Sequence, residues 1–100
     1  MAVFVSGRGS NLSAILNYPD LKNKVEIVAV VSDKIDCKAF DIAREFKITT
    51  LTVGDGVGMI SKTSITSELK KLEVNFIILA GYLKLIPDDL IENFDNRIIN

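Results

Sequence analysis

The stretch AVFVSGRGSNL, residues 2–12, decides the fold of this 100-residue chain. Its first part, residues 2–6, is a short run rich in valine and phenylalanine, which predicts a buried β-strand. Two glycines, Gly7 and Gly9, follow it, and from Ser10 onward apolar residues recur at helical spacing. The stretch therefore predicts a strand, a tight turn and a helix in immediate succession.

The rest of the chain repeats this alternation of strand and helix. Strands are predicted at residues 25–32, 48–53, 76–80 and 97–100, helices at 38–46, 62–72 and 87–94, and a loop at 54–58. VEIVAVVS (25–32) is continuous in valine and isoleucine rather than alternating, as expected of a parallel strand covered on both faces. The predicted fold class is therefore α/β: a Rossmann-like open, mostly parallel sheet with right-handed crossovers and helices on both faces.

Composition limits the classes of protein to consider. With 48% hydrophobic residues, 25% charged residues and a net charge of −1, the chain resembles one ordinary globular domain. The near-zero charge argues against nucleic acid as a partner. The lone Cys37 can form no internal disulfide. Neither a basic leader nor an apolar run of membrane-spanning length is visible, so we expect a cytoplasmic protein that uses no membrane.

A doubly wound sheet of this kind binds ligands at one edge. With the strands in the order 3-2-1-4-5, the site lies beyond their carboxyl ends, beside the first strand, where the order reverses. This arrangement would bring together residues 7–11, residues 81–86 and Asn100, at the ends of the first, fourth and fifth strands. These three segments form the candidate site.

The turn after the first strand is suited to an anion. The backbone amides of Gly9, Ser10 and Asn11 would lie at the helix N-terminus, where unpaired N–H groups and the helix dipole attract negative charge. Glycine at positions 7 and 9 lets the backbone approach the anion without a Cβ in the way. The alternative is structural: the glycines make the turn and Ser10 caps the helix.

Two nucleotide-binding patterns fit this turn only in part. The dinucleotide pattern G-x-G-x-x-G has a third small residue where this chain has Leu12, although Asp33 stands about 20 residues on, as a ribose-binding acid would. No G-K-[ST] follows the turn, which argues against a P-loop. A nicotinamide cofactor stays open as an alternative.

A second cluster, LAGYLKLIP at residues 79–87, follows the fourth strand. Gly81 ends that strand, and the apolar residues after it could line a pocket for a flat organic ligand. They could equally pack the next helix onto the sheet, and the sequence favours neither alternative.

Together, SGRGSNL, LAGYLKLIP and the closing RIIN resemble the phosphoribosylglycinamide formyltransferases, the folate-dependent enzymes of purine synthesis. In that family the backbone of S-G-x-G-S-N-L cradles the substrate's phosphate. A stretch A-G-[YF]-[ML]-[RK]-[IL]-[LI] borders the folate pterin, and R-[IVL]-[IL]-N continues into a histidine-bearing segment. All three stretches match in order and at family-like spacing, so the resemblance covers essentially the whole chain.

The resemblance implies a reaction and a role for each matched residue. The implied reaction is formyl transfer from 10-formyltetrahydrofolate, as cosubstrate, to the amine of 5'-phosphoribosylglycinamide, with no metal. The implied phosphate-binding residues are Gly9, Ser10 and Asn11, the implied folate-binding residues are Lys62, Leu83, Lys84, Leu85, Ile86 and Asn100, and the implied catalytic residue is Asn100. The loop before Lys62 is shorter than in many family members.

The absence of histidine fits this interpretation. Formyl transfer passes through a tetrahedral intermediate whose negative oxygen a side-chain amide can stabilise, typically by about 3–4 kcal/mol. Proton movement needs a group that titrates near neutrality, and the family's histidine stands shortly after the asparagine that Asn100 matches, supported by a later aspartate. We therefore expect residues 1–100 to be the N-terminal portion of a single formyltransferase domain, truncated at the active-site strand, and to be inactive alone.

Other functions stay open at this point. Formyltetrahydrofolate deformylase and methionyl-tRNA formyltransferase share the asparagine–histidine strand but lack the G-S-N-L turn in this form. A non-catalytic domain that binds an anion or a partner and a nicotinamide-binding domain are the remaining alternatives. In the main interpretation the partners are small-molecule substrates, and a homodimer is compatible with it.

Overall fold

Strands and helices alternate along the chain in the predicted order. In the computed structural model the described residues are 1–6, 10–17, 26–35, 37–82 and 86–99. The strands are β1 (Ala2–Val5), β2 (Ala29–Ser32), β3 (Thr49–Thr52), β4 (Ile77–Leu79) and β5 (Ile98–Ile99). The helices are α1 (Ser10–Asn17), α3 (Lys38–Glu45), α4 (Ile65–Lys71) and α5 (Asp88–Asn93).

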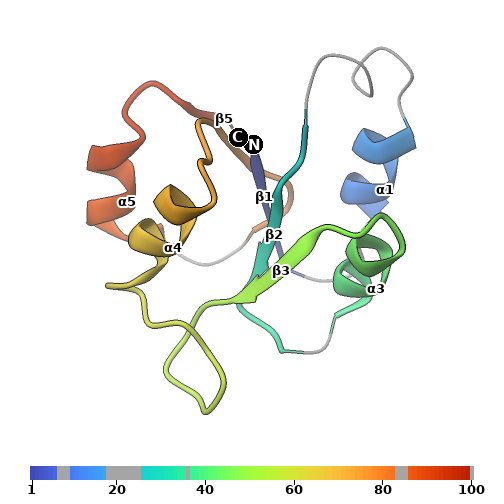
Figure 1. Cartoon of the computed structure of the whole chain (residues 1–100), viewed down its shortest axis with the longest axis horizontal. Helices are drawn as coiled ribbons and strands as arrows, with labels where there is room; N and C mark the ends of the chain where they lie inside the picture. Colours follow the sequence, from blue (N-terminus) through green and yellow to red (C-terminus); the bar gives the residue numbers. More distant parts are fainter. Residues whose placement is uncertain (7–9, 18–25, 36, 83–85, 100) are drawn as a thin grey trace.

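The five strands form one sheet in the order β3-β2-β1-β4-β5, and every neighbouring pair is parallel (Figure 1). β1 is the central strand, where Phe4 lies opposite Val31 of β2 and Leu79 of β4. The strand order therefore reverses beside β1, as predicted for a doubly wound sheet. The predicted α/β fold class is confirmed.

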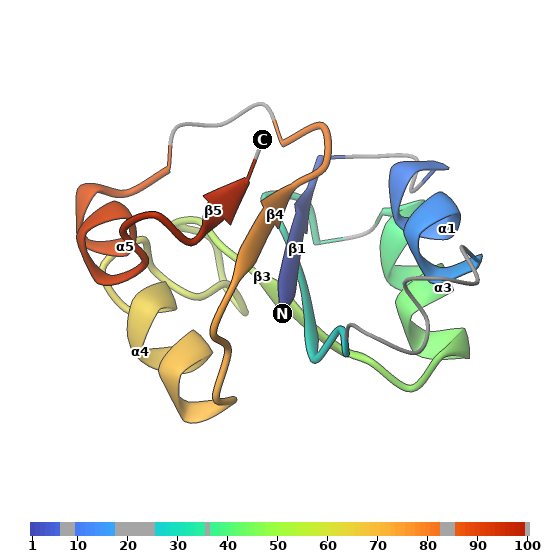
Figure 2. The ribbon, with the colours of Figure 1, turned by 90° about the horizontal axis from the view of Figure 1, so that it is seen from above.

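Helices cover both faces of the sheet, with α1 and α3 on one side and α4 and α5 on the other (Figure 2). Side chains alternate along a strand, so β1 contributes Val3 and Val5 to the α1/α3 layer and Ala2 and Phe4 to the α4/α5 layer. Every residue of β1 and β2 is buried, which explains their continuous apolar sequence. The edge strand β3 is partly exposed and carries threonines.

The observed elements are shorter than the predicted ones. The strand predicted at residues 25–32 begins at Ala29. The helix predicted at residues 62–72 begins at Ile65. Before it, a separate turn is closed by hydrogen bonds that the amides of Ser64 and Ile65 donate to the carbonyl of Ser61, at 3.0 and 3.1 Å. Hydrophobic spacing predicted which elements exist, whereas local hydrogen bonds set where each begins.

The chain leaves β4 and enters α5 through two conformationally special residues. Gly81 has φ +78°, a left-handed conformation that glycine adopts without strain. Pro87, with φ −58° and ψ 142°, is extended and caps α5, so this helix begins one residue later than the predicted 87–94. Asp88 and Asp89 occupy its first turn, where carboxylates are favoured by the helix dipole.

Thr66 is an unpartnered polar residue in the α4/α5 layer. Its side chain is 3% exposed, and its Oγ1 has no hydrogen-bond partner. Burial of such a hydroxyl costs about 1–3 kcal/mol, and valine has the same branched shape without it. Thr66→Val is therefore expected to raise the free energy of unfolding by about 1 kcal/mol in urea denaturation.

The control for this substitution is Thr63→Val. Thr63 is exposed, and its hydroxyl already shares a 3.0 Å hydrogen bond with Ser61 Oγ, so no gain in stability is expected there. An equal gain in both variants, or a loss of stability in Thr66→Val, would contradict the prediction.

Candidate functional site

The carboxyl ends of β1, β4 and β5 lie together at one edge of the sheet, at the top of the view in Figure 2. Val5, the last residue of β1, pairs with Ser32 at the end of β2. On the other side, the amide of Ala80 donates a 2.8 Å hydrogen bond to the carbonyl of Phe4, which continues the pairing of β4 with β1 beyond the end of β4. The segments that follow these strands therefore leave from neighbouring points.

The start of α1 lies near this edge (Figure 2). Ser10 is the first residue of α1, and Leu12, fully buried in the α1/α3 layer, anchors its first turn. Gly9 and the side chains of Ser10 and Asn11 lie outside the described residues. The predicted succession of strand and helix is confirmed, whereas the predicted turn at residues 7–9 lies outside the described residues. The N-terminus of α1, where a helix favours anions, lies at the carboxyl edge of the sheet.

The segment after β4 begins on the opposite face of the sheet. The Tyr82 ring packs edge-on against the ring of Phe4, with centroids 5.3 Å apart and planes at 84°. Ile86 is partly buried against the same α4/α5 layer. Leu83, Lys84 and Leu85 lie outside the described residues. Both described ends of the segment therefore pack on the sheet.

Lys62 follows a compact loop that projects from the carboxyl end of β3 (Figure 1). The loop is closed by hydrogen bonds from the amide of Gly54 to the carbonyl of Ile60 (2.9 Å) and from the amide of Ile60 to the carbonyl of Thr52 (2.7 Å). Its residue Val57 is 98% exposed. Lys62 is exposed and forms no ion pair with a described residue, so its ammonium group is free to approach an anionic ligand.

Asn100 lies outside the described residues. Ile99, which precedes it in the sequence, pairs with Ile78 of β4. The strand β5, which precedes the predicted catalytic residue in the sequence, is therefore the direct neighbour of β4, which precedes the predicted folate-binding segment.

Two residues at this edge show an interaction that sequence reasoning missed. Asp33 Oδ1 is buried and has no hydrogen-bond partner. Burial raises the pKa of the Tyr82 hydroxyl, and the negative charge of Asp33 raises that pKa further. From the sequence, Asp33 was a candidate only for a ribose-binding acid and Tyr82 only for a pocket residue. The signal that unites them is the strand order, since β2 and β4 flank β1.

The described residues hold no group of three or more histidine, cysteine, aspartate or glutamate side chains that could bind a metal ion. In the same part of the chain, no helix is long and apolar enough to cross a membrane.

Comparison with known proteins gives one consistent result. The chain matches the family described as formyl transferase over residues 1–100. It is 38% identical to the phosphoribosylglycinamide formyltransferase, chloroplastic, of Arabidopsis thaliana, over 100% of this chain and 36% of that protein. It is 34% identical to the phosphoribosylglycinamide formyltransferase of Bacillus subtilis (strain 168), over 99% of this chain and 53% of that protein.

Solved structures show the same similarity. The crystal structure of glycinamide ribonucleotide transformylase 1 from Geobacillus kaustophilus matches with a TM-score of 0.82 at 27% identity, over 97% of this chain and 54% of that one. The chain spans about a third to a half of the length of the curated relatives it matches. The family match extends over every residue of the sequence. The chain therefore belongs to the formyl transferase family.

Proposed function

We propose that residues 1–100 are the N-terminal part of a formyltransferase domain that acts in de novo purine biosynthesis. The reaction transfers a formyl group from 10-formyltetrahydrofolate to the amine of 5'-phosphoribosylglycinamide. The observation that supports this most strongly is the placement of the α1 N-terminus and the segment after β4 on either side of the β1 carboxyl end. An anion site and a ligand-bordering segment then share one edge, as a two-substrate transfer requires.

In this proposal the two substrates contact the three segments of the candidate site. The backbone of Gly9, Ser10 and Asn11 holds the phosphate at the start of α1. Residues 83–86, largely through backbone groups, border the folate, and Lys62 approaches it from the loop after β3. In this proposal both ligands lie beside the end of β1.

Asn100 stabilises the transition state in the proposed reaction. The substrate amine attacks the formyl carbon, and the carbonyl oxygen takes up negative charge as the tetrahedral intermediate forms. The side-chain amide of Asn100 donates a hydrogen bond to that oxygen. The bond to folate N10 then breaks, the attacking nitrogen loses a proton and N10 gains one. Because these residues include no histidine, proton transfer is assigned to the histidine and aspartate that follow the matching asparagine in the family.

The partners proposed are the two small-molecule substrates, with neither nucleic acid nor membrane, and a homodimer is compatible with them. The relatives from Arabidopsis thaliana and Vigna unguiculata are named as chloroplastic. We propose the cytoplasm as the location of this protein. Expression of a fluorescent fusion of the natural protein tests that location.

A formyl-transfer assay on the natural protein that carries residues 1–100 tests the proposed function. Purified protein is given 10-formyltetrahydrofolate with 5'-phosphoribosylglycinamide, with methionyl-tRNA or with water alone as acceptor. We expect transfer to the ribonucleotide only. Transfer to tRNA or release of formate would support one of the related formyl-folate enzymes, and NADH binding without any transfer would support the nicotinamide alternative.

The same assay includes Gly9→Val. The added side chain obstructs the approach of the anion to the backbone, so the KM for the ribonucleotide is expected to rise about 10- to 100-fold, the equivalent of one charge-assisted hydrogen bond. Affinity for the folate should change little. Ala14→Val is the control, since it adds methyl groups on the exposed face of α1. An unchanged KM in Gly9→Val would remove the phosphate assignment.

A further inference from the structure

Asp33 presents an open hydrogen-bond acceptor at the carboxyl end of β2. Its Oδ1 is shielded from solvent, yet no hydrogen-bond donor contacts it. The backbone before it is held on both sides: the carbonyl of Ser32 accepts from the amide of Val53 at 2.9 Å, and Ser32 Oγ accepts from the amide of Lys34 at 3.2 Å. Because a buried carboxylate oxygen without a donor is costly, this atom requires a partner.

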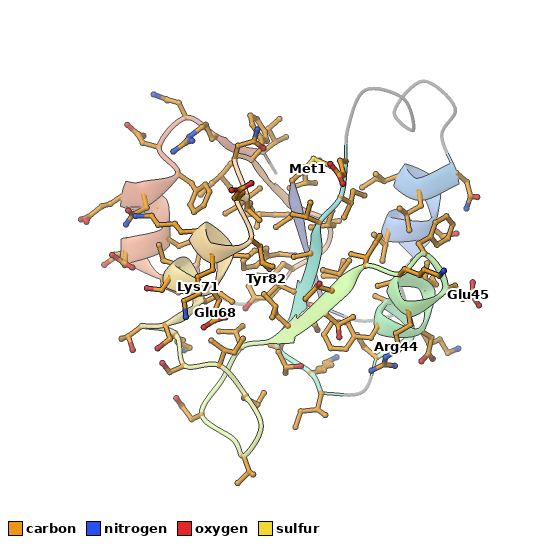
Figure 3. The ribbon with its side chains drawn as sticks, viewed as in Figure 1. Met1, Arg44, Glu45, Glu68, Lys71 and Tyr82 are labelled. Carbon is orange, nitrogen blue, oxygen red and sulfur yellow. The ribbon has the colours of Figure 1, made fainter. Side chains whose placement is uncertain are left out.

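Tyr82 is partly buried, and its hydroxyl makes no hydrogen bond with another described residue. Its ring is fixed against Phe4 of β1, on the side of the sheet that faces α4 (Figure 3). The combined effect of burial and of the Asp33 charge is a pKa above the ordinary tyrosine value, so the hydroxyl stays protonated at neutral pH and can donate.

The sheet places these two groups on either side of one strand. Val31 and Leu79 both lie opposite Phe4 and pack in the α4/α5 layer with it. Asp33 follows Val31 by two residues, and Tyr82 follows Leu79 after the turn at Gly81. Neighbouring strands lie about 4.8 Å apart, so β2 and β4 are separated by roughly 10 Å, and the Tyr82 ring lies over the strand between them.

We propose that one bridging water molecule links the Tyr82 hydroxyl, as donor, to Asp33 Oδ1, as acceptor, and that this pair positions the segment that follows β4. Asp33 and Tyr82 are positioning residues in this proposal, since they act on the segment at 83–86 rather than on the reacting atoms. The pair itself rests on the contacts above, whereas its effect on folate binding rests on the proposed function.

The pair predicts that a double variant is less impaired than one of its single variants. Tyr82→Phe removes the donor and leaves the buried carboxylate without a partner. Asp33→Asn in that background removes the charge that was left alone, so the double variant should be less impaired than Tyr82→Phe. Removal of both partners of a buried hydrogen bond is generally milder than removal of one.

The experiment is a double-mutant cycle in the natural protein, with urea unfolding and steady-state formyl transfer as parallel measurements. Tyr82→Phe is expected to raise the KM for 10-formyltetrahydrofolate about tenfold, with a smaller effect on kcat. Addition of Asp33→Asn should recover at least half of that loss on a logarithmic scale. The unfolding measurements should show the same recovery without any substrate. In a spectroscopic titration, Asp33→Asn should lower the pKa of Tyr82.

Asp95→Asn is the matched control. It also removes one negative charge, but Asp95 is exposed and precedes β5, at the opposite edge of the parallel sheet. It should change neither the KM nor the stability of Tyr82→Phe. Additive effects in the unfolding cycle would overturn the pair. Non-additive effects on unfolding together with an unchanged KM would overturn the positioning role. A wild-type protein that shows no formyl transfer would overturn the proposed function, and the unfolding cycle would still test the pair.

Discussion

In the natural protein, Asn100→Ala is expected to lower the kcat for formyl transfer about 100- to 1,000-fold, with a much smaller effect on either KM. The amide contributes mainly once charge has developed on the carbonyl oxygen, so its removal raises the barrier more than it weakens substrate binding. Steady-state rates with each substrate varied in turn give both constants.

Two further variants separate this role from packing. Asn100→Asp keeps the size of the side chain but replaces the amide donor with a carboxylate, which repels the developing oxyanion, so its kcat should fall at least as far. Asn75→Ala is the control, because Asn75 is exposed and precedes β4 at the far edge of the sheet. A loss of less than tenfold in Asn100→Ala would exclude Asn100 as the main oxyanion donor.

Phe4→Ala is expected to lower the free energy of unfolding by about 3–5 kcal/mol. Phe4 is 1% exposed in the central strand, and it supports the ring of Tyr82. Its truncation removes buried apolar surface and leaves a cavity between the sheet and the α4/α5 layer, which the surrounding strands are too constrained to fill. Urea denaturation followed by circular dichroism measures the change.

Phe46→Ala is the matched control for this loss. Phe46 caps the end of α3 and is 41% exposed, so the same truncation should cost about 1 kcal/mol or less. If Phe4→Ala prevents folding altogether, Phe4→Leu should fold with a loss of about 1 kcal/mol, because it nearly conserves volume. Equal losses in Phe4→Ala and Phe46→Ala would contradict the placement of Phe4 in the core.

The fold was predictable because its signals are local. Each signal reflects local structure: the continuous apolar runs of the central strands, the glycines after β1, and Gly81 after β4. The alternation of these runs with helical spacing is compatible with few topologies. The ends of elements were less predictable. α4 begins at Ile65, after a separate turn that is closed by hydrogen bonds to the carbonyl of Ser61. Hydrophobic spacing does not encode this turn.

The candidate site was predictable only at the level of segments. The strand order determines which loops meet, so the segments after β1, β4 and β5 could be grouped from the sequence. Asp33 and Tyr82 could not be paired in the same way, since neither the spacing nor the type of these residues marks them as neighbours. The same holds for Thr66, whose lone hydroxyl is a consequence of tertiary packing.

The chain departs from β1 and from β4 toward opposite faces of the sheet, since α1 packs with α3 and α5 packs with α4. In the proposed function the segment after β1 holds the phosphate of the ribonucleotide and the segment after β4 borders the folate, so the ribonucleotide must reach across the edge of the sheet to the formyl group. The distance across this edge then determines how long the substrate must be between its phosphate and its amine. A short phosphate compound can occupy the anion end without its other end reaching the folate. Because backbone spacing sets this distance, and no single side chain does, single substitutions can weaken binding at either end but cannot change the substrate length that is required.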